Sequence, residues 1–289
     1  MTNAWGNEIK KLTESLLEFR LNDGGFPYRR GNASSGEPTI FATAAFWASD
    51  MSLPETEKTL AWLLASVNPD GSIGMSPTLK TEGIWMSPHF AILMHHLAKL
   101  PERDRAIKFI LEFKSETYEQ KEDIDQDNSL IGWPWVNGTF GWVEPTAWAL
   151  IALNIFGLEN HPRCIEARKL ILDRRIAGGG WNYGNRYVCH SDLLPFRDTT
   201  ALALLALRGF VEENLLKSSI EILEKESSDL EALYSLAWSV ICLDVFGKDV
   251  SKLQERLYDM LSLPRGEDFN LAHFALGIIA LSDKRVFSK

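Results

Sequence analysis

The feature that most constrains the fold is residues 139–156, TFGWVEPTAWALIALNIF, a segment that is apolar on almost every side after its polar start. Pro145 lies near the start of the predicted helix, where its missing N–H costs nothing, and Glu144 precedes it. A helix that is apolar all round is buried rather than lying on a surface. The segment therefore predicts an inner helix that other helices cover.

Two other segments share this design. Residues 36–47 read GEPTIFATAAFW, and residues 196–207 read FRDTTALALLAL. Each places an acidic residue and a threonine at the start of a buried helix rich in alanine or leucine. The three segments predict inner helices of a ring, whose polar starts face a common cavity.

Amphipathic and buried segments alternate along the whole chain. Residues 5–21, for example, place Ile9, Leu12 and Leu16 on one helical face, with lysines and glutamates opposite. The predicted amphipathic helices are 5–21, 54–67, 101–117, 160–176, 211–226 and 249–262, and the predicted buried helices are 37–49, 87–100, 144–157, 198–209, 229–246 and 268–281. Repeats of this spacing are typical of a closed or solenoidal array. We expect an all-α fold, an α/α toroid of about six inner and six outer helices, as a single domain over residues 1–289.

Composition excludes several classes of partner. The net charge is -9, and no block of Lys or Arg interrupts the sequence, so a nucleic-acid or anionic-membrane partner is not expected. Cys164, Cys189 and Cys242 are scattered and odd in number, which indicates a reducing compartment. No apolar signal region opens the chain, and no run of ~18 apolar residues predicts a membrane span. We therefore expect a soluble, cytoplasmic protein without an integral membrane segment; its oligomeric state stays open.

The repeated turns and helix starts resemble a known superfamily. Residues 22–28 (NDGGFPY), residues 178–183 (GGGWNY) and the helix starts EPT, EPT and RDTT are similar to the prenyltransferase/squalene-cyclase repeat. That superfamily includes squalene and oxidosqualene cyclases, class II diterpene cyclases and protein prenyltransferase β subunits. The resemblance implies an α6/α6 toroid with an apolar central cavity and an isoprenoid or other apolar small-molecule ligand.

The resemblance leaves three functions open. The leading hypothesis is a terpene-cyclase-like protein that handles an isoprenoid or lipid, with acid-initiated cyclisation in an aromatic-lined cavity; as an enzyme it would be an isomerase or lyase. The second is a non-catalytic toroid module that binds a lipid or peptide. The third is a zinc-dependent, prenyltransferase-like enzyme, in which His273 stands at the family's histidine position, with Asp198 and the Cys189–His190 loop near the other ligands.

Three acidic residues at helix starts are the candidate catalytic groups: Glu144, Asp198 and Glu37. In class II cyclases the middle Asp of an Asp-x-Asp-Asp-Thr motif protonates the substrate. In this chain Arg197 stands at that position in the helix start FRDTT, and Glu144 stands there in the helix start WVEPT. A carboxylate at a helix N-terminus can be a simple capping residue. At an apolar cavity, desolvation instead raises its pKa and makes it a proton donor. The helix dipole opposes that rise, and the sequence leaves the outcome open.

Aromatic residues gather at the junctions between loops and helices, where packing alone less often requires them. Their faces would hold an apolar chain and stabilise a carbocation by ~1–2 kcal/mol each. The candidate substrate-binding residues are Trp133, Trp135, Trp142, Trp181, Tyr183, Trp85 and Trp238.

No metal or cofactor site is predicted. The acidic segment that begins at Asp123 and ends at Asp127 resembles half of a calcium loop, but Asn128 and Pro134 stand where an EF-hand needs Gly and Glu. A solvated loop, a looser Ca²⁺ or Mg²⁺ site and a catalytic acid all remain open for this segment. The adjacent Cys189 and His190 usually point apart on a loop, so a nucleophile pair is not favoured. We expect the histidines of residues 89–96 to be satisfied core residues.

Overall fold

The computed structural model describes residues 5–51, 54–81, 83–119, 125–188, 191–227, 232–266, 269–282 and 286–288. The chain divides into two compact units. Unit 1 comprises Met1–Phe109 and Ser251–Val286, and unit 2 comprises Ile110–Val250 and Phe287–Lys289. The expectation of a single domain stays a prediction.

Twelve helices lie in the described part of the chain, which agrees in number and order with the sequence pattern. They are α1 (Gly6–Leu17), α2 (Gly36–Ala48), α3 (Pro54–Ala65), α4 (Met86–His96), α5 (Leu100–Glu112), α6 (Val143–Ile155), α7 (Pro162–Asp173), α8 (Arg197–Leu207), α9 (Glu213–Ser227), α10 (Leu233–Val245), α11 (Ser251–Ser262) and α12 (Leu271–Leu281). Most are a few residues shorter than predicted. Among the described residues, no helix is long and apolar enough to cross a bilayer.

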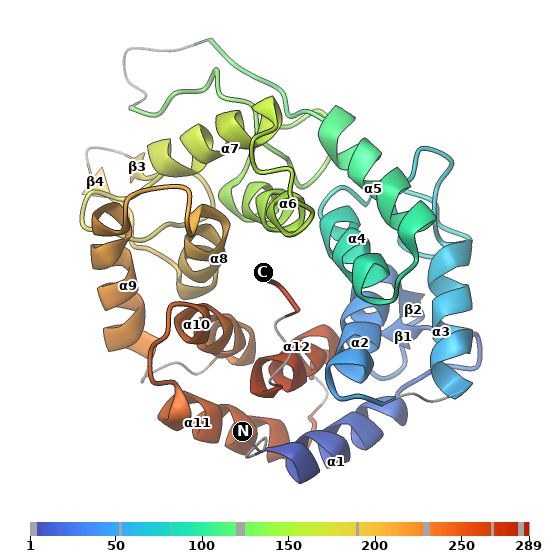
Figure 1. Ribbon diagram of the computed structural model, residues 1–289. Coiled ribbons are helices and arrows are strands. Elements are labelled where there is room, and N and C mark those ends of the chain that lie inside the picture. Colours follow the sequence, from blue (N-terminus) through green and yellow to red (C-terminus); the bar gives the residue numbers. More distant parts are fainter. Residues whose placement is uncertain are drawn as a thin grey trace. The chain divides into compact units, whose positions relative to one another are not determined.

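Unit 1 is built around α2, whose residues are buried on nearly every side. Helix α2 packs against α12, α4, α3 and α1, and α1, α3 and α11 lie outside α2 and α12 (Figure 1). Before α2 the chain forms a short antiparallel pair, β1 (Phe26–Pro27) with β2 (Ser34–Ser35). Buried and amphipathic helices thus form inner and outer layers, as their sequence patterns predict.

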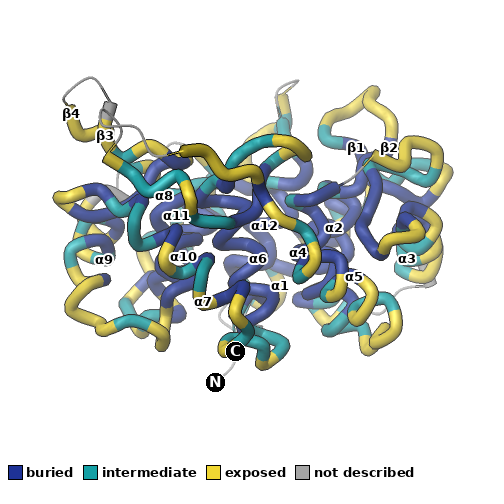
Figure 2. The backbone as a smooth tube through the Cα atoms, turned by 90° about the horizontal axis from the view of Figure 1, so that it is seen from above, coloured by how far each residue is buried: buried dark blue, intermediate teal, exposed yellow. Residues whose placement is uncertain are grey.

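Unit 2 repeats this arrangement around α8. Helix α8 packs against α10, α6, α9 and α7, and α7 and α9 lie outside α6 and α8 (Figure 1). A second short pair, β3 (Tyr187–Val188) with β4 (Ser191–Asp192), precedes α8. Figure 2 shows the buried stretches following the inner helices, while exposed residues gather in the loops. The loops before α6 and α8 are therefore accessible at the helix starts.

One hydrogen-bond arrangement recurs at the starts of the inner helices. The threonine of each EPT or DTT segment accepts a hydrogen bond from the backbone N–H of the residue that follows the glycine turn. The three pairs are Phe26 with Thr39 at 2.9 Å, Trp133 with Thr146 at 3.0 Å, and Trp181 with Thr200 at 3.0 Å. In a fourth copy, Ser87 accepts from Ile73 at 3.3 Å. We call this contact the threonine clamp; it fixes each loop against the helix that follows it.

The clamp turns the first aromatic ring of each loop into the protein interior. The indole Nε1 of Trp133 donates to Ile110 O at 2.9 Å, and that of Trp181 donates to Ile171 O at 2.6 Å. Both rings are buried, at 1% and 0% exposure. These indoles therefore join an inner helix to an outer one, and burial gives them a structural explanation.

Candidate functional site

Three carboxyl groups occupy the same position in three helices. Glu37, Glu144 and Asp198 are each the second residue of α2, α6 and α8. The N-cap residues of these helices form no side-chain capping hydrogen bond. Glu144 and Asp198 belong to unit 2, and Glu37 belongs to unit 1.

Glu144 is held at the interface of α6 and α10. Its side chain is 6% exposed, and its Oε1 accepts a hydrogen bond from the Tyr234 hydroxyl at 2.8 Å. A buried carboxylate is tolerable only when it is hydrogen-bonded, and a charge-assisted bond of this length is among the stronger ones. Glu144 therefore presents a fixed acceptor at the start of α6.

Aromatic rings fill the space one helical turn below this bond. Trp148, four residues after Glu144, packs edge-to-face against Trp238 with ring centroids 4.7 Å apart. Phe287 lies against both, at 5.4 Å from Trp148 and 5.2 Å from Trp238. The three rings thus form a compact cluster one helical turn from the carboxyl group, and Trp238 is one of the residues named from the sequence.

Asp198 occupies a different environment at the start of α8. Its Oδ1 accepts a hydrogen bond from Thr199 N at 2.8 Å. Burial raises the pKa of the Asp198 carboxyl group. This hydrogen bond and one from the Ser235 side chain lower the pKa, but by less, so the pKa is raised overall. For this residue, burial therefore outweighs the hydrogen bonds that favour the ionised form.

Tyr183 lies near both carboxyl groups of unit 2. Burial raises the pKa of its phenol, and the charges of Asp198 and Glu144 raise it further. Its backbone O accepts from Val143 N at 2.9 Å, which ties its loop to the start of α6. The ring packs against Phe196 at 4.8 Å, and the two rings remain 46% and 44% exposed. A ligand in solvent can therefore reach an aromatic surface beside the acids.

Trp142 extends this aromatic surface. Its ring stacks on Phe140 with centroids 4.6 Å apart, and its backbone N donates to Trp133 O at 3.1 Å. A Cβ added at Gly184 would lie 3.3 Å from the Trp142 ring, so the loop that carries Tyr183 passes closely over it. We define the unit 2 site as Trp142, Glu144, Tyr183, Phe196, Asp198 and Tyr234.

Glu37 forms a similar carboxyl–phenol contact in unit 1. Its Oε2 accepts from the Tyr28 hydroxyl at 2.5 Å. Burial raises the pKa of Glu37, although the hydrogen bond from Tyr28 lowers it, and burial together with the Glu37 charge raises the pKa of Tyr28. The backbone O of Tyr28 in turn accepts from Leu271 N at 2.9 Å. Glu37 is therefore hydrogen-bonded to Tyr28, and Tyr28 in turn links the start of α2 to the start of α12.

The other predicted residues take varied positions. Trp133, Trp181 and Trp238 are buried, whereas Trp85 and Trp135 are half-buried. Trp85 is the N-cap residue of α4. Two site residues were missed. Phe196 directly precedes the RDTT segment and Tyr234 lies one turn before Trp238, so an aromatic residue at a helix start was the available signal.

The histidines of α4 serve different contacts within unit 1. His89 is 3% exposed and its ring lies 5.2 Å from Phe41. His96 stacks on Trp47 at 4.1 Å, and its Nε2 lies 2.9 Å from Val286 O. His95 lies 3.3 Å from an Arg103 guanidinium nitrogen. Each of the three rings thus contacts another group of unit 1.

Within the described part of the chain, no group of three His, Cys, Asp or Glu side chains could hold a metal ion. Asp125 forms an ion pair with Arg186 at 2.9 Å, and Asp127 accepts from Ser129; Asp123 lies outside the described residues. Cys189 and His190 also lie outside them. Burial lowers the pKa of His273 to about 4, so this imidazole is neutral at pH 7.

No known protein family and no curated protein matches the sequence. Solved structures do match over nearly the whole chain. An α-amylase from Clostridium perfringens superposes with a TM-score of 0.69 at 10% identity, covering 97% of this chain and 99% of the amylase. The α-1,6-mannanase of Salegentibacter sp. HEL1_6 superposes with a TM-score of 0.66 at 11% identity, covering 96% and 98%.

A type II terpene cyclase from Scytonema, in complex with geranylgeranyl dihydroxybenzoate, superposes with a TM-score of 0.60 at 11% identity, covering 96% of this chain and 97% of the cyclase. Likeness at this level of identity shows the fold alone, because one fold carries many activities. The chain therefore has the all-α toroid fold that the sequence predicted, a fold shared by glycoside hydrolases and terpene cyclases.

Proposed function

We propose that the unit 2 site hydrolyses a glycosidic bond in a neutral oligosaccharide. The observation that carries this proposal is the placement of Glu144 and Asp198 at the second positions of α6 and α8, beside the paired and exposed rings of Tyr183 and Phe196. Two carboxyl groups in different environments are the usual machinery of glycoside hydrolysis, one as acid and the other as base or nucleophile. The resemblance in fold to a mannanase and an amylase is consistent with this class of substrate.

The two carboxyl groups differ in a way that suggests their roles. Burial raises the pKa of Asp198, so Asp198 retains a proton at higher pH than an ordinary aspartate and serves as the general acid. Glu144 accepts a hydrogen bond from the Tyr234 hydroxyl, which holds its carboxyl group in place for the role of base. Asp198 protonates the departing glycosidic oxygen while the C–O bond breaks. Glu144 takes a proton from the water that attacks the anomeric carbon.

Two exposed rings, Tyr183 and Phe196, and the half-buried ring of Trp142 supply the binding surface. Tyr183, Phe196 and Trp142 lie beside the acids, and an aromatic ring presents an apolar face together with a polar edge or hydroxyl. A sugar ring has an apolar C–H face that can lie on such a surface. The Tyr183 hydroxyl can bond a sugar hydroxyl at the same time.

The test is turnover of α-linked manno- and gluco-oligosaccharides by the full chain. Asp198→Asn and Glu144→Gln are each expected to lower turnover by about 10²–10⁴-fold while oligosaccharide binding persists. Phe196→Ala is expected to weaken binding. Glu221→Gln, on the exposed side of α9, is the matched control. Turnover that survives both carboxyl substitutions would contradict the proposal, as would a wild-type protein that neither binds nor cleaves these sugars.

A terpene-cyclase-like activity is the second candidate, and a different observation favours it. Trp148, Trp238 and Phe287 form an aromatic cluster one helical turn from Glu144, and aromatic faces stabilise a carbocation. In this reaction the acid adds a proton to an alkene, and the cyclised cation later returns one. Turnover of a geranylgeranyl-bearing aromatic substrate, abolished by Asp198→Asn or Glu144→Gln and weakened by Trp148→Leu, would support it. A protein that binds one of these ligands without converting it would be the non-catalytic module.

A further inference from the structure

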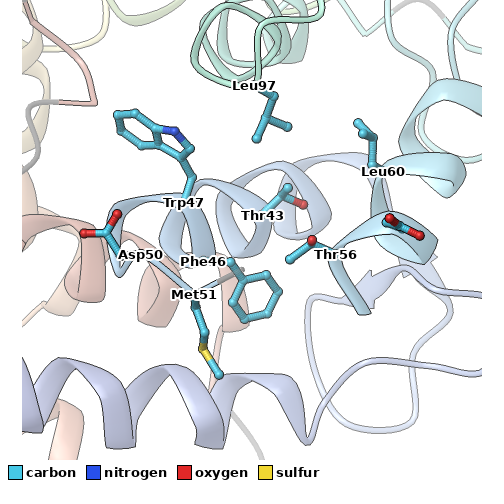
Figure 3. Close-up of a pocket in the computed structure, with 9 residues that line it drawn as sticks. Thr43, Phe46, Trp47, Asp50, Met51, Thr56, Leu60 and Leu97 are labelled. Atoms are coloured by element: carbon cyan, nitrogen blue, oxygen red, sulfur yellow. The ribbon is translucent and has the colours of Figure 1, made fainter. Parts of the chain in front are cut away.

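Two pockets of unit 1 differ in the charge of their lining. Figure 3 shows the first, of about 420 Å³, with Trp47 on one side and Met51 on the other. Among the described residues that line it, none is Lys or Arg. The second pocket has a volume of about 480 Å³, within the range of small-molecule sites, and its lining includes Lys11, Arg30 and Arg265. This basic lining makes the second pocket a candidate site for an anion.

The second pocket is formed by one face of α1, by Arg30 and by the end of α11 with the segment that follows it, all of which belong to unit 1. Helices α1 and α11 lie side by side (Figure 1), and Trp5, which precedes α1, packs against Tyr258 of α11 with ring centroids 5.1 Å apart. Leu12 and Leu261, one from each helix, are buried. The pocket therefore lies between two outer helices and has an apolar base.

The lining of this pocket is positively charged overall. Of the described residues that line it, Lys11, Arg30 and Arg265 are basic and Glu8 is acidic. Lys11 and Arg30 are exposed, whereas Arg265 and Glu8 are half-buried. The whole chain carries a net charge of -9, so an excess of basic groups is not a general property of its surface. The local charge favours an anion at this pocket, although the protein as a whole is acidic.

Aromatic rings bring the two arginines of the pocket together. The guanidinium carbon of Arg30 lies 4.3 Å from the centroid of the Phe19 ring, and that of Arg265 lies 5.3 Å from the same centroid. The two guanidinium groups are therefore no farther apart than the sum of these distances. Arg265 also lies 4.5 Å from the Phe274 centroid and 5.5 Å from that of Phe269. Stacking on a ring uses the face of a guanidinium and leaves the N–H donors at its edge for a ligand.

Neither guanidinium group is neutralised by a bound carboxylate. Among the described residues, neither Arg30 nor Arg265 forms an ion pair or a side-chain hydrogen bond, and the buried Nε of Arg265 has no hydrogen-bond partner. Burial lowers the pKa of Arg265; the charge of Glu18 raises it, and the charge of Arg30 lowers it. The two arginines thus repel one another, and an anion between them would replace this repulsion by two attractions.

We infer that this pocket binds a small phosphate monoester, whose phosphate group is held between the guanidinium groups of Arg30 and Arg265. The forked N–H donors of arginine match the oxygens of a phosphate group. Two arginines, with Lys11 as a third positive charge, suit a dianion better than a carboxylate, which a single guanidinium satisfies. The half-buried Tyr258 ring in the same lining offers a surface for the organic part. This site belongs to unit 1 and is independent of the hydrolysis proposed for unit 2.

The experiment titrates phenyl phosphate, benzoate and benzyl alcohol into the full chain by calorimetry. A phosphate-free buffer at about pH 7.5 keeps the monoester close to its dianionic form. We expect phenyl phosphate to bind at least about 10-fold more tightly than benzoate, because one further charge-assisted hydrogen bond is enough for a tenfold change, and benzyl alcohol to bind most weakly. Added salt should weaken the binding of phenyl phosphate and leave that of benzyl alcohol unchanged.

Substitutions in the lining test the assignment residue by residue. Arg30→Gln and Arg265→Gln are each expected to weaken the binding of phenyl phosphate by about 5-fold. Arg265→Lys keeps the charge should loss of the ring contacts of Arg265 disturb folding, and Arg30→Gln changes an exposed side chain. Glu8→Gln removes the opposing charge and should strengthen binding by about 2-fold. Arg105→Gln, at an exposed position of α5, is the matched control and should change nothing.

A phosphate monoester can be a soluble molecule or the headgroup of phosphatidate, and vesicles distinguish the two sources. We expect no more protein to sediment with phosphatidylcholine vesicles that contain phosphatidate than with those that lack it, because the net charge of -9 opposes an anionic bilayer. Sedimentation with phosphatidate without binding of phenyl phosphate would overturn the inference. So would a phenyl phosphate affinity that is no higher than that of benzyl alcohol or that is insensitive to Arg30→Gln.

Discussion

The hydroxyl of Tyr234 donates a hydrogen bond of 2.8 Å to Glu144, which precedes it by 90 positions in the chain. The same pairing of an acid at the second position of an inner helix with a phenol occurs in unit 1, where Tyr28 donates to Glu37 at 2.5 Å. In unit 1 the phenol comes from the loop before the helix, and in unit 2 it comes from another helix. Each contact satisfies a carboxyl group that burial would otherwise destabilise.

Tyr234→Phe is expected to lower the free energy of unfolding by about 1–3 kcal/mol, because it removes a donor from a buried carboxylate. Chemical denaturation of Tyr234→Phe, Glu144→Gln and the double variant measures the coupling in a double-mutant cycle. The exposed Tyr118→Phe is the control. Strictly additive effects of the two substitutions would show that the bond does not contribute.

Thr200→Val should destabilise the protein by about 1–3 kcal/mol, because valine matches the shape of threonine but leaves a buried backbone N–H unsatisfied. The Thr200 hydroxyl accepts from Trp181 N at 3.0 Å and donates to Trp181 O at 3.2 Å. Thr200→Ser keeps the hydroxyl and loses one methyl group, which costs about 0.8 kcal/mol. Denaturation in which valine costs no more than serine would exclude the threonine clamp as a stabilising contact.

Local patterns were sufficient to predict the helices. Apolar residues on every side identified α2, α6 and α8, and one-sided periodicity identified α1 and α11. The boundaries were less accurate. Helix α1 ends at Leu17 rather than near residue 21, since Gly24 N bonds Leu21 O and Leu21 N bonds Gly25 O in the turn that follows. These turn contacts compete with the last helical turn.

The candidate site was predictable only in part. The acids at the helix starts were evident from the repeated EPT and DTT segments, and Tyr183 from its loop. Which aromatic residue of a loop faces solvent depends on the threonine clamp, which turns Trp181 inward and leaves Tyr183 exposed two positions later. The pairing of Tyr234 with Glu144 depends on the packing of distant helices, and no local pattern encodes that contact.

The Asp198→Asn variant is expected to become more stable relative to wild type as pH rises. Because the folded-state pKa of Asp198 is raised, the folded protein holds this proton more tightly than the unfolded chain does. The associated stability is present at low pH and is lost as pH rises through the folded pKa. Asparagine mimics the protonated acid, so the difference should grow to roughly 1 kcal/mol in favour of the variant. Melting temperatures at pH 4–8 measure it, and a difference that falls with pH would contradict the assignment of Asp198 as the acid.

Acidification should destabilise unit 1 through His89. Burial lowers the pKa of His89 to about 3, so below its ordinary pKa the unfolded chain binds a proton that the folded protein does not. Stability is therefore lost as pH falls below about 6.5, by about 2 kcal/mol at pH 5. Denaturation at pH 5 and 7 should show a smaller pH dependence for His89→Leu than for wild type. His161→Asn, which replaces one helix-capping residue by another, controls for the loss of a histidine; equal acid sensitivity in all three proteins would exclude His89 as its source.

Ala98→Gly is expected to stabilise the protein. Ala98 follows the end of α4 with φ 54°, and the bonds from Ala98 N to His95 O at 3.1 Å and from Lys99 N to Met94 O at 2.8 Å form a Schellman motif. An alanine in this left-handed conformation costs about 1–2 kcal/mol, whereas glycine adopts it freely. Glycine also gains more entropy in the unfolded chain, so the net gain should be about 0.5–1 kcal/mol. Ala61→Gly, at an exposed position inside α3, should instead lose about 1 kcal/mol. Denaturation midpoints that move in the same direction for both substitutions would show that Ala98 is not strained.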